Sequence, residues 1–171
     1  MVQSAAMQAS TAAGWDRHAT TYASMFAPLT GYIARAMLRL IAARLPARAQ
    51  LLDIACGTGA LTLQAVERAL HERTTTGAAG TVTASDFSAG MVRHTRMAAA
   101  AIGADDAILR CDVQNGEALT YDDASFDAVG SSFGIFLFDD RAAGWREAAR
   151  VLRPGGLFVT SVWQGPETNM M

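Results

Sequence analysis

Two closely spaced glycines are the first residues with the geometry of a ligand site. The stretch 51–59 (LLDIACGTG) predicts a short buried strand followed by a turn. Glycines at positions 57 and 59 let the backbone turn sharply and let a ligand approach with no side chain in the way. The helix predicted after Gly59 presents free N–H groups at its N-terminus. We therefore expect this turn to contact a ligand through its backbone.

Two acidic residues stand at the ends of the next two predicted strands. Asp86 can accept hydrogen bonds from both hydroxyls of a ribose, and Phe87 beside it can lie against a purine. Asp112 can accept a hydrogen bond from an exocyclic amine. Together with the glycine turn, these side chains predict an adenosine site.

The same turn argues against a ligand that carries a pyrophosphate. The dinucleotide fingerprint G-x-G-x-x-G requires a third glycine at the position that Thr62 occupies. Asp53 would add a negative charge close to the pyrophosphate, which is unfavourable. A cationic nucleoside such as S-adenosylmethionine therefore fits better than a nicotinamide cofactor.

Helices and strands alternate along the chain and would position these residues. Ser88 and either Asp139 or Asp140 are predicted helix caps, residues 73–80 a loop, and residues 153–156 a turn. The apolar spacing predicts strands at 50–56, 81–86, 107–112, 126–133 and 157–163. This order predicts an α/β fold, a Rossmann-like parallel sheet with helices on both faces. The ligand is then expected beyond the carboxyl ends of the strands.

The composition limits the classes of function. The 171 residues are 51% hydrophobic and 18% charged, as expected of one folded domain. The net charge of -2 argues against nucleic-acid partners. All 14 basic residues are Arg, and the absence of Lys excludes a lysine Schiff base and a Walker-type phosphate loop. No apolar run approaches the ~20 residues of a membrane span, and no secretory signal is found. We therefore expect a cytoplasmic protein.

These motifs resemble, in order, those of the class I S-adenosylmethionine-dependent methyltransferases, especially the small-molecule branch that includes the ubiquinone/menaquinone-biosynthesis C-methyltransferases. The stretch 51–59 is similar to the first motif of that family, with Ala55 in place of a common glycine. Residues 84–88 with Met91 resemble the ribose-binding motif, and residues 111–113 the adenine-side segment. Similarity continues through 132–134 and 150–156, so that it covers about residues 50 to 163.

The resemblance implies methyl transfer from S-adenosylmethionine to a small-molecule acceptor, such as a quinone precursor or another aromatic, by in-line displacement. The resemblance implies that backbone atoms of Ala55, Cys56 and Gly57 contact the methionine part of the cofactor. It implies no fixed catalytic residue and no metal. The predicted cofactor-binding residues are Tyr22, Asp53, Ala55, Cys56, Gly57, Thr58, Gly59, Asp86, Phe87, Met91, Asp112, Val113 and Ser132.

The resemblance also predicts the domain organisation. Residues 1–48 would form an N-terminal helical cap and residues 49–171 the Rossmann-like domain. In related methyltransferases a similar helix folds over the cofactor, with a Tyr at the place of Tyr22, and His18 is a candidate base. The family's sheet has seven strands and only five are predicted here, so we expect the domain to be C-terminally incomplete. A homodimer is a further expectation.

The sequence is also compatible with two other functions. One is a non-catalytic S-adenosylmethionine-binding subunit or truncated pseudoenzyme, and the other is an NAD(P)-dependent oxidoreductase. Several further residues are interpreted as structural or surface groups without a chemical role: Cys56 and Cys111 as unpaired packing residues, Asp127 as a loop anchor, Trp15, Trp145 and Trp163 as packing groups, and His71 and His94 as surface residues.

Overall fold

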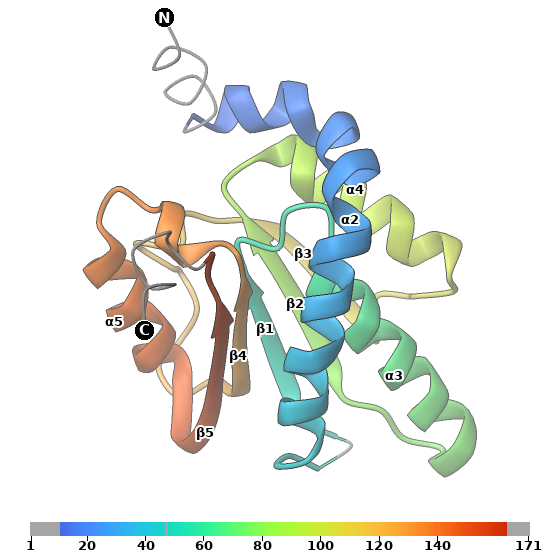
Figure 1. Ribbon diagram of the computed structural model, residues 1–171. Helices are drawn as coiled ribbons and strands as arrows, with labels where there is room; N and C mark the ends of the chain where they lie inside the picture. The colour runs from blue at the N-terminus through green and yellow to red at the C-terminus, as the bar shows by residue number, and fades with distance from the viewer. Residues whose placement is uncertain (1–10, 47, 164–171) are drawn as a thin grey trace, which may run out of the picture.

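A five-stranded, all-parallel sheet in the order β3-β2-β1-β4-β5 forms the centre of the computed structural model, which describes residues 11–46 and 48–163. The strands are β1 (Gln50–Ile54), β2 (Thr81–Asp86), β3 (Leu109–Val113), β4 (Phe126–Ser132) and β5 (Leu152–Ser161). The helices are α2 (Ala12–Ala42), α3 (Ala60–Thr76), α4 (Ala89–Ala101) and α5 (Arg141–Val151), with a short 3-10 turn, η1 (Ile135–Leu137). Helices α2, α3 and α4 lie on one side of the sheet and α5 on the other (Figure 1). The predicted α/β fold is confirmed.

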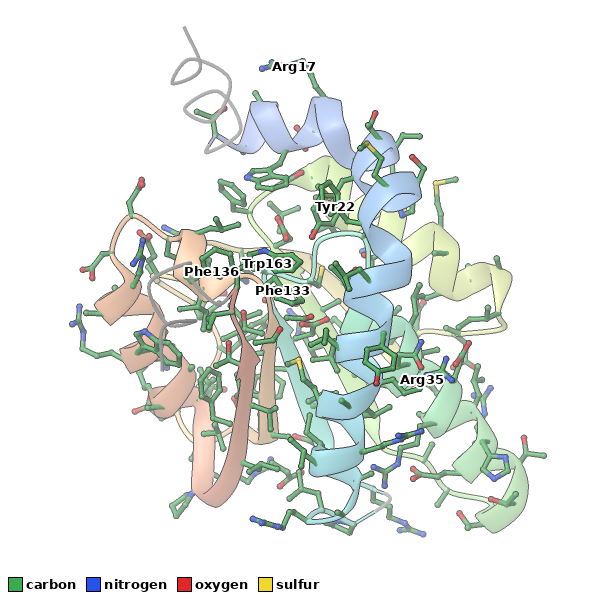
Figure 2. All side chains as sticks on the ribbon, in the orientation of Figure 1. Arg17, Tyr22, Arg35, Phe133, Phe136 and Trp163 are labelled. Atoms are coloured by element: carbon green, nitrogen blue, oxygen red, sulfur yellow. The ribbon has the colours of Figure 1, made fainter. Side chains whose placement is uncertain are left out.

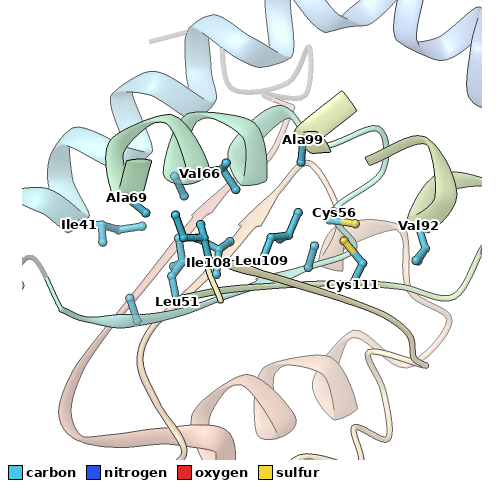
Figure 3. Close-up of a cluster of buried hydrophobic side chains, with 14 residues drawn as sticks. Ile41, Leu51, Cys56, Val66, Ala69, Val92, Ala99, Ile108, Leu109 and Cys111 are labelled. Atoms are coloured by element: carbon cyan, nitrogen blue, oxygen red, sulfur yellow. The ribbon is translucent and has the colours of Figure 1, made fainter. Parts of the chain in front are cut away.

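The central strand β1 is buried on both faces, which explains its apolar sequence. Its Leu51 joins a cluster with residues of α3 and β2 such as Val66 and Val82, drawn in Figure 3. Leu52 and Ile54 point the other way and pack with residues such as Val151 of α5. Because β1 pairs with β2 on one side and with β4 on the other, the order of the strands reverses there. A ligand site is expected at such a reversal.

Both predicted helix caps are present. The Ser88 hydroxyl accepts a hydrogen bond from Met91 N at the start of α4, and Asp140 accepts one from Ala143 N at the start of α5. Of the two candidates, Asp140 is therefore the cap, whereas Asp139 lies one residue earlier. These caps satisfy N–H groups that the helix itself leaves without a partner.

The structure corrects several of the predicted boundaries, since β1 ends at Ile54, β3 covers Leu109–Val113 and β5 covers Leu152–Ser161. Helix α3 continues to Thr76 and ends at Gly77, with φ +73°, so the first half of the predicted loop 73–80 is helical. The hydroxyls of Thr74, Thr75 and Thr76 donate to carbonyl groups one turn earlier, which supports a helix that their weak propensity does not predict. The predicted turn 153–156 lies inside β5, where the register with β4 is irregular.

Asp127 holds this irregular region together, as predicted. Its carboxylate accepts from Gln50 N (2.7 Å) and pairs with the Arg153 guanidinium (2.7 Å). Partial burial acts to raise the pKa of Asp127, but the hydrogen bonds and charge of its two partners together outweigh burial and lower the pKa. The carboxylate thus joins the starts of β1, β4 and β5, at the edge of the sheet opposite the predicted ligand site.

Helix α2 is a long bent helix that packs on α3, α4 and β5 (Figure 1). Its inner residues Ala34 and Met37 are buried against Leu61 of α3. Pro28 lies within the helix and lacks the N–H that would continue the hydrogen-bond ladder, which is the usual cause of a bend. The N-terminal part of α2 reaches over the carboxyl ends of the strands. The division of the chain after residue 48 stays a prediction.

Candidate functional site

A cavity of about 370 Å³ opens at the carboxyl ends of β1, β2, β3 and β4, with α2 along one side. Many of the predicted site residues line it, although they come from distant parts of the sequence. The predicted residues on its walls are Tyr22, Ala55, Cys56, Gly57, Thr58, Asp86, Phe87, Met91 and Ser132. Their roles in cofactor binding stay predictions.

The turn after β1 is held in an unusual backbone conformation by its neighbours. Ala55, Gly57 and Gly59 have φ values of +54°, +55° and +94°, in the left-handed region that favours glycine. The Gly57 N–H donates to an Asp86 carboxylate oxygen (2.9 Å), and the Gly57 carbonyl accepts from the Thr95 hydroxyl (2.8 Å). The turn is therefore fixed from both β2 and α4 before any ligand arrives. Gly59 packs against Thr95 and Leu63 and does not line the cavity.

Asp86 is the central carboxylate of the site. One of its oxygens accepts from Gly57 N (2.9 Å) and the other from Ser88 N (3.0 Å). The side chain is only 6% exposed, and burial raises its pKa while these N–H groups act in the opposite direction. Each carboxylate oxygen has more than one lone pair, so Asp86 keeps the capacity to accept from a ligand in the cavity.

Asp53 lies beneath the cavity wall and does not line it, which corrects its predicted place there. Its Oδ2 accepts from the Thr62 N–H (3.0 Å) and the Thr62 hydroxyl (2.6 Å). Its Oδ1 is buried and has no hydrogen-bond partner among the described residues. Burial, with the charge of Asp86 as a smaller contribution, raises the pKa of Asp53 to about 7. Thr62, which replaces the third glycine of the dinucleotide fingerprint, thus anchors this carboxylate.

Asp112 and Val113 also lie outside the cavity walls, contrary to their prediction as an adenine pocket. Asp112 accepts from the Tyr121 hydroxyl (2.9 Å) and pairs with Arg110 Nε (2.7 Å). Val113 is exposed. Alternation along β3 turns Asp112 toward Tyr121, while Cys111 joins the cluster on the other face. The loop after β3 contributes Gln114, Asn115, Gly116 and Glu117 to the cavity instead, and the Asn-Gly pair was the only sequence signal for it.

Helix α2 covers one side of the cavity with aromatic side chains. Tyr22 lies beneath the N-terminal part of α2, above the strand ends (Figure 2). Burial and the nearby charge of Asp86 raise the pKa of Tyr22, so its hydroxyl stays protonated at neutral pH. Trp15 packs edge-on against Tyr22, at 5.7 Å between ring centroids, and also lines the cavity. The prediction that Trp15 is a packing group is confirmed, and its ring also forms part of the cavity wall.

The other residues interpreted as structural are mostly confirmed. Trp145 packs against Phe158 and Trp163 stacks on Phe133 (Figure 2), although both tryptophans keep exposed surface. Cys56 and Cys111 are buried free thiols, and burial raises the pKa of both, so neither is an activated nucleophile.

The histidine predictions have different outcomes. His71 is exposed, as predicted. His94 is half-buried, and its Nδ1 is buried with no partner among the described residues, so its prediction as a surface residue was wrong. His18 lies in α2, but its side chain is outside the described part of the structure, and its prediction as a base is not tested.

The exit of β4 forms the wall opposite α2. The Ser132 hydroxyl oxygen is buried and has no partner within residues 11–46 and 48–163. Phe133 has a φ of +56°, and Gly134 packs closely against the turn after β1. The turn after β1 and the exit of β4 are therefore neighbouring parts of the cavity wall.

Gly134→Ala should disturb this contact. A Cβ at position 134 would lie 2.5 Å from the Ala55 Cβ and 2.7 Å from the Ser131 Oγ, so one of the loops must shift. We expect a loss of about 1–3 kcal/mol in the free energy of unfolding, measured by urea titration. Gly31→Ala in α2 is the control, because no heavy atom lies within 4 Å of its new Cβ. A Gly134→Ala chain as stable as the unmodified one would contradict the proposed contact.

The charged side chains on the cavity wall all have the same sign. They are Asp86, Glu117 and Asp139, and no Arg, Lys or His side chain lines the cavity in the part of the chain that the structure describes. No group of three metal-ligating side chains was found in the same residues. The cavity therefore favours a cationic ligand over a phosphate or another anion.

The family of the chain follows from its match to known proteins. A model of the methyltransferase domain matches residues 52–160, from β1 to the last residues of β5. The chain belongs to the methyltransferase domain family. The resemblance found in the sequence motifs is thus confirmed.

The relatives of this methyltransferase-domain chain act in different pathways. It is 37% identical over 120 residues to a ubiquinone/menaquinone biosynthesis C-methyltransferase of Hahella chejuensis, a match that covers 70% of the chain and 45% of that protein. It is 34% identical over 142 residues to the nocamycin O-methyltransferase of Saccharothrix syringae, covering 83% of the chain and 47% of that protein. The chain spans less than half the length of these relatives.

Solved structures support the fold of this methyltransferase-domain chain. A protein of Methanococcus maripaludis superimposes with a TM-score of 0.68 at 20% identity, over 88% of this chain and 63% of that one. At this identity the likeness shows the fold alone. Within the described residues, no helix combines the length and the apolar character needed to cross a bilayer.

Proposed function

We propose that the chain binds S-adenosylmethionine and forms the cofactor-binding part of an enzyme that methylates a small molecule. The observation that carries this proposal is the cavity at the reversal of the strand order, whose charged walls are all carboxylates. Asp86 is buried at the end of β2 and lines this cavity, which supports the role of ribose acceptor proposed for it. Membership of the methyltransferase domain family supports the same function.

The residues present fit the charge of this cofactor. S-adenosylmethionine carries a sulfonium and an ammonium group and no phosphate. Asp86 and Glu117 on the wall provide negative charge for such a ligand, and Asp53 beneath the wall adds to it when ionised. The buried Asp53 Oδ1 has no partner among the described residues, so a cation bound in the cavity would favour the ionised form of this carboxyl through space. A pyrophosphate would find no compensating positive side chain on the described walls.

Each part of the cavity has a role in the proposal. Asp86 would accept from the ribose hydroxyls, with Phe87 and Met91 beside the adenine. Backbone atoms of the turn at Gly57 would hold the methionine part. Asp112 and Val113 do not face the cavity, so Gln114 and its neighbours would take their place at the adenine.

When bound, S-adenosylmethionine supplies a methyl group on a sulfonium that is already a good leaving group. The chain then needs to orient the acceptor in line and to exclude water, and a general base helps only if the acceptor must lose a proton. Trp15, Tyr22, Phe133 and Phe138 give the cavity aromatic walls suited to both tasks. A quinone precursor or another aromatic acceptor is proposed on this basis, and no catalytic residue is assigned.

Calorimetry tests the proposal directly. S-adenosylmethionine and S-adenosylhomocysteine are expected to bind the chain, and NAD is expected to give no binding at the same concentrations. Tighter binding of NAD would overturn the proposal. A methyl-transfer assay with small quinols then separates an enzyme from a binding subunit, because a chain that binds the cofactor and transfers no methyl group supports the latter. The homodimer stays a prediction, which sedimentation of the same sample would test.

A further inference from the structure

We infer that Asp16 is a positioning residue that fastens the first turns of α2 over the cavity and couples this closure to the binding of the cofactor. The coupling rests on the proposed function, whereas the fastening rests on contacts of the chain alone. Asp16, Ser88 and Gly90 are called the latch below. None of these three residues lines the cavity, and Asp16 is exposed to solvent.

The latch joins two segments that are more than seventy residues apart in the sequence. Asp16 Oδ1 accepts from the Ser88 hydroxyl (2.5 Å) and from the Gly90 N–H (2.7 Å). Both donors lie at the N-terminal end of α4, where free N–H groups favour a negative charge. These hydrogen bonds, with that to Ser88 as the largest contribution, lower the pKa of Asp16. Asp16 is therefore ionised at neutral pH, and its hydrogen bonds are of the short, charge-assisted kind.

Gly90 shows how closely the two helices approach. A Cβ at position 90 would lie 2.8 Å from the Asp16 Oδ1 and 3.0 Å from the Asp16 Cα. The second distance involves backbone, so a side-chain rotation of Asp16 would not relieve the contact. The position of α2 over α4 thus depends on the absence of a side chain at residue 90.

The latch continues into the site through Ser88. The Ser88 hydroxyl that donates to Asp16 also accepts from Met91 N, and the Ser88 N–H donates to Asp86 Oδ1 (3.0 Å). The other Asp86 oxygen holds Gly57 of the turn after β1. An unbroken series of hydrogen bonds therefore leads from α2 to the carboxylate proposed to bind the ribose.

The latch also positions the aromatic wall of the cavity. Trp15 is adjacent to Asp16 in α2, and Tyr22 follows less than two turns later. Both line the cavity, and they contact each other edge-on. Release of Asp16 from α4 would let this wall move away from Asp86. By linkage, a ligand that contacts the wall must in turn favour the fastened state.

Three variants and a control test the inference. Asp16→Ala removes both hydrogen bonds of the latch, and Asp16→Asn keeps an oxygen acceptor but removes the charge. Gly90→Ala retains Asp16 but forces α2 away from α4, while it should favour α4 itself, because Ala is the better helix former. Gly31→Ala is the control, since it makes the same change in open space within α2.

The first measurement is hydrogen exchange of the amides of residues 12–24 without ligand. We expect Asp16→Ala and Gly90→Ala to speed this exchange by about fivefold or more, Asp16→Asn to have a smaller effect, and Gly31→Ala to show no such increase. Apart from the first turn of α4, where the N–H of residue 90 loses its acceptor, exchange elsewhere in the chain should not change, which separates release of the latch from a general loss of stability. Unchanged exchange at 12–24 in Asp16→Ala would overturn the fastening.

The second measurement is the Kd of S-adenosylhomocysteine by calorimetry. We expect Asp16→Ala and Gly90→Ala to raise it about five- to tenfold, in the usual range of coupling between sites. Faster exchange with an unchanged Kd would overturn the coupling but keep the fastening. If the unmodified chain bound neither S-adenosylmethionine nor S-adenosylhomocysteine, the proposed function and the coupling would fail, and the exchange comparison would still decide the fastening.

Discussion

Asp86→Ala is expected to weaken binding of S-adenosylmethionine by at least about tenfold, while the chain remains folded. A tenfold change corresponds to about 1.4 kcal/mol, and hydrogen bonds to a charged group contribute about 1.5–3 kcal/mol each. The substitution removes the acceptor proposed for two ribose hydroxyls. It also leaves Gly57 N and Ser88 N without the oxygens that now position them. Calorimetry with the cofactor measures the change.

The control for Asp86 is a carboxylate of the same charge outside the cavity. Asp105 pairs with Arg73 at the surface (2.7 Å) and does not line the cavity. Asp105→Ala changes the net charge by the same amount and should leave the affinity as it was. If both substitutions had the same effect, or if Asp86→Ala had none, the ribose role of Asp86 would be wrong. Circular dichroism of each variant verifies that the chain is folded.

The second expected effect is a loss of stability as the pH rises, caused by Asp53. Burial raises its pKa from 3.8 to about 7, so the folded chain holds a proton there that the unfolded chain releases. At pH values between these two pKa values, the unfolded state binds fewer protons than the folded state. The free energy of unfolding therefore falls as the pH rises. The full difference is about 4 kcal/mol at most, at 1.36 kcal/mol for each pKa unit.

Asp53→Asn isolates this effect. The amide oxygen can still accept from Thr62, but position 53 no longer titrates. Urea unfolding at pH 5 and pH 7.5 should show a clear fall in stability for the unmodified chain and a smaller fall for Asp53→Asn. The other titratable groups are present in both chains, so the comparison isolates position 53 together with its electrostatic coupling to Asp86. Equal slopes for the two chains would contradict the assignment to Asp53.

Binding of the cofactor should cause Asp53 to lose the proton that it holds in the folded chain. A bound cation favours the ionised carboxylate, so affinity for S-adenosylmethionine is expected to increase as the pH rises toward 7, with release of a fraction of a proton. Calorimetry in two buffers of different ionisation enthalpy measures this release. Asp53→Asn should abolish it. The same release in both chains would place the titrating group elsewhere.

Much of the candidate site could be predicted from local sequence. The glycine turn after β1 and Asp86 at the end of β2 were predicted to meet, and a hydrogen bond of 2.9 Å now joins them. The prediction worked because the carboxyl ends of parallel strands lie at one edge of a sheet, whatever the lengths of the connections between them. The caps at Ser88 and Asp140 were predictable for a similar reason, because capping involves residues only three positions apart.

Some of the predicted site residues do not line the cavity, and the difference lies in the direction of single side chains. Asp112 lies one residue before the end of β3, and the alternation of the strand turns it toward Tyr121 and away from the cavity. β3 covers Leu109–Val113, so it begins two residues later and ends one residue later than predicted. The apolar pattern alone does not locate a strand end to one residue.

The sequence by itself determined the order of strands and helices, the parallel sheet and the edge at which a ligand would bind. These follow from apolar periodicity and from turn and cap residues, which act over a few neighbouring positions. Only the tertiary structure decided that Thr62 holds Asp53, that Trp15 lines the cavity and that Asp16 meets Ser88 and Gly90. Those contacts depend on the packing of helices that are distant in the chain, and the local pattern of residues does not encode the distance between them.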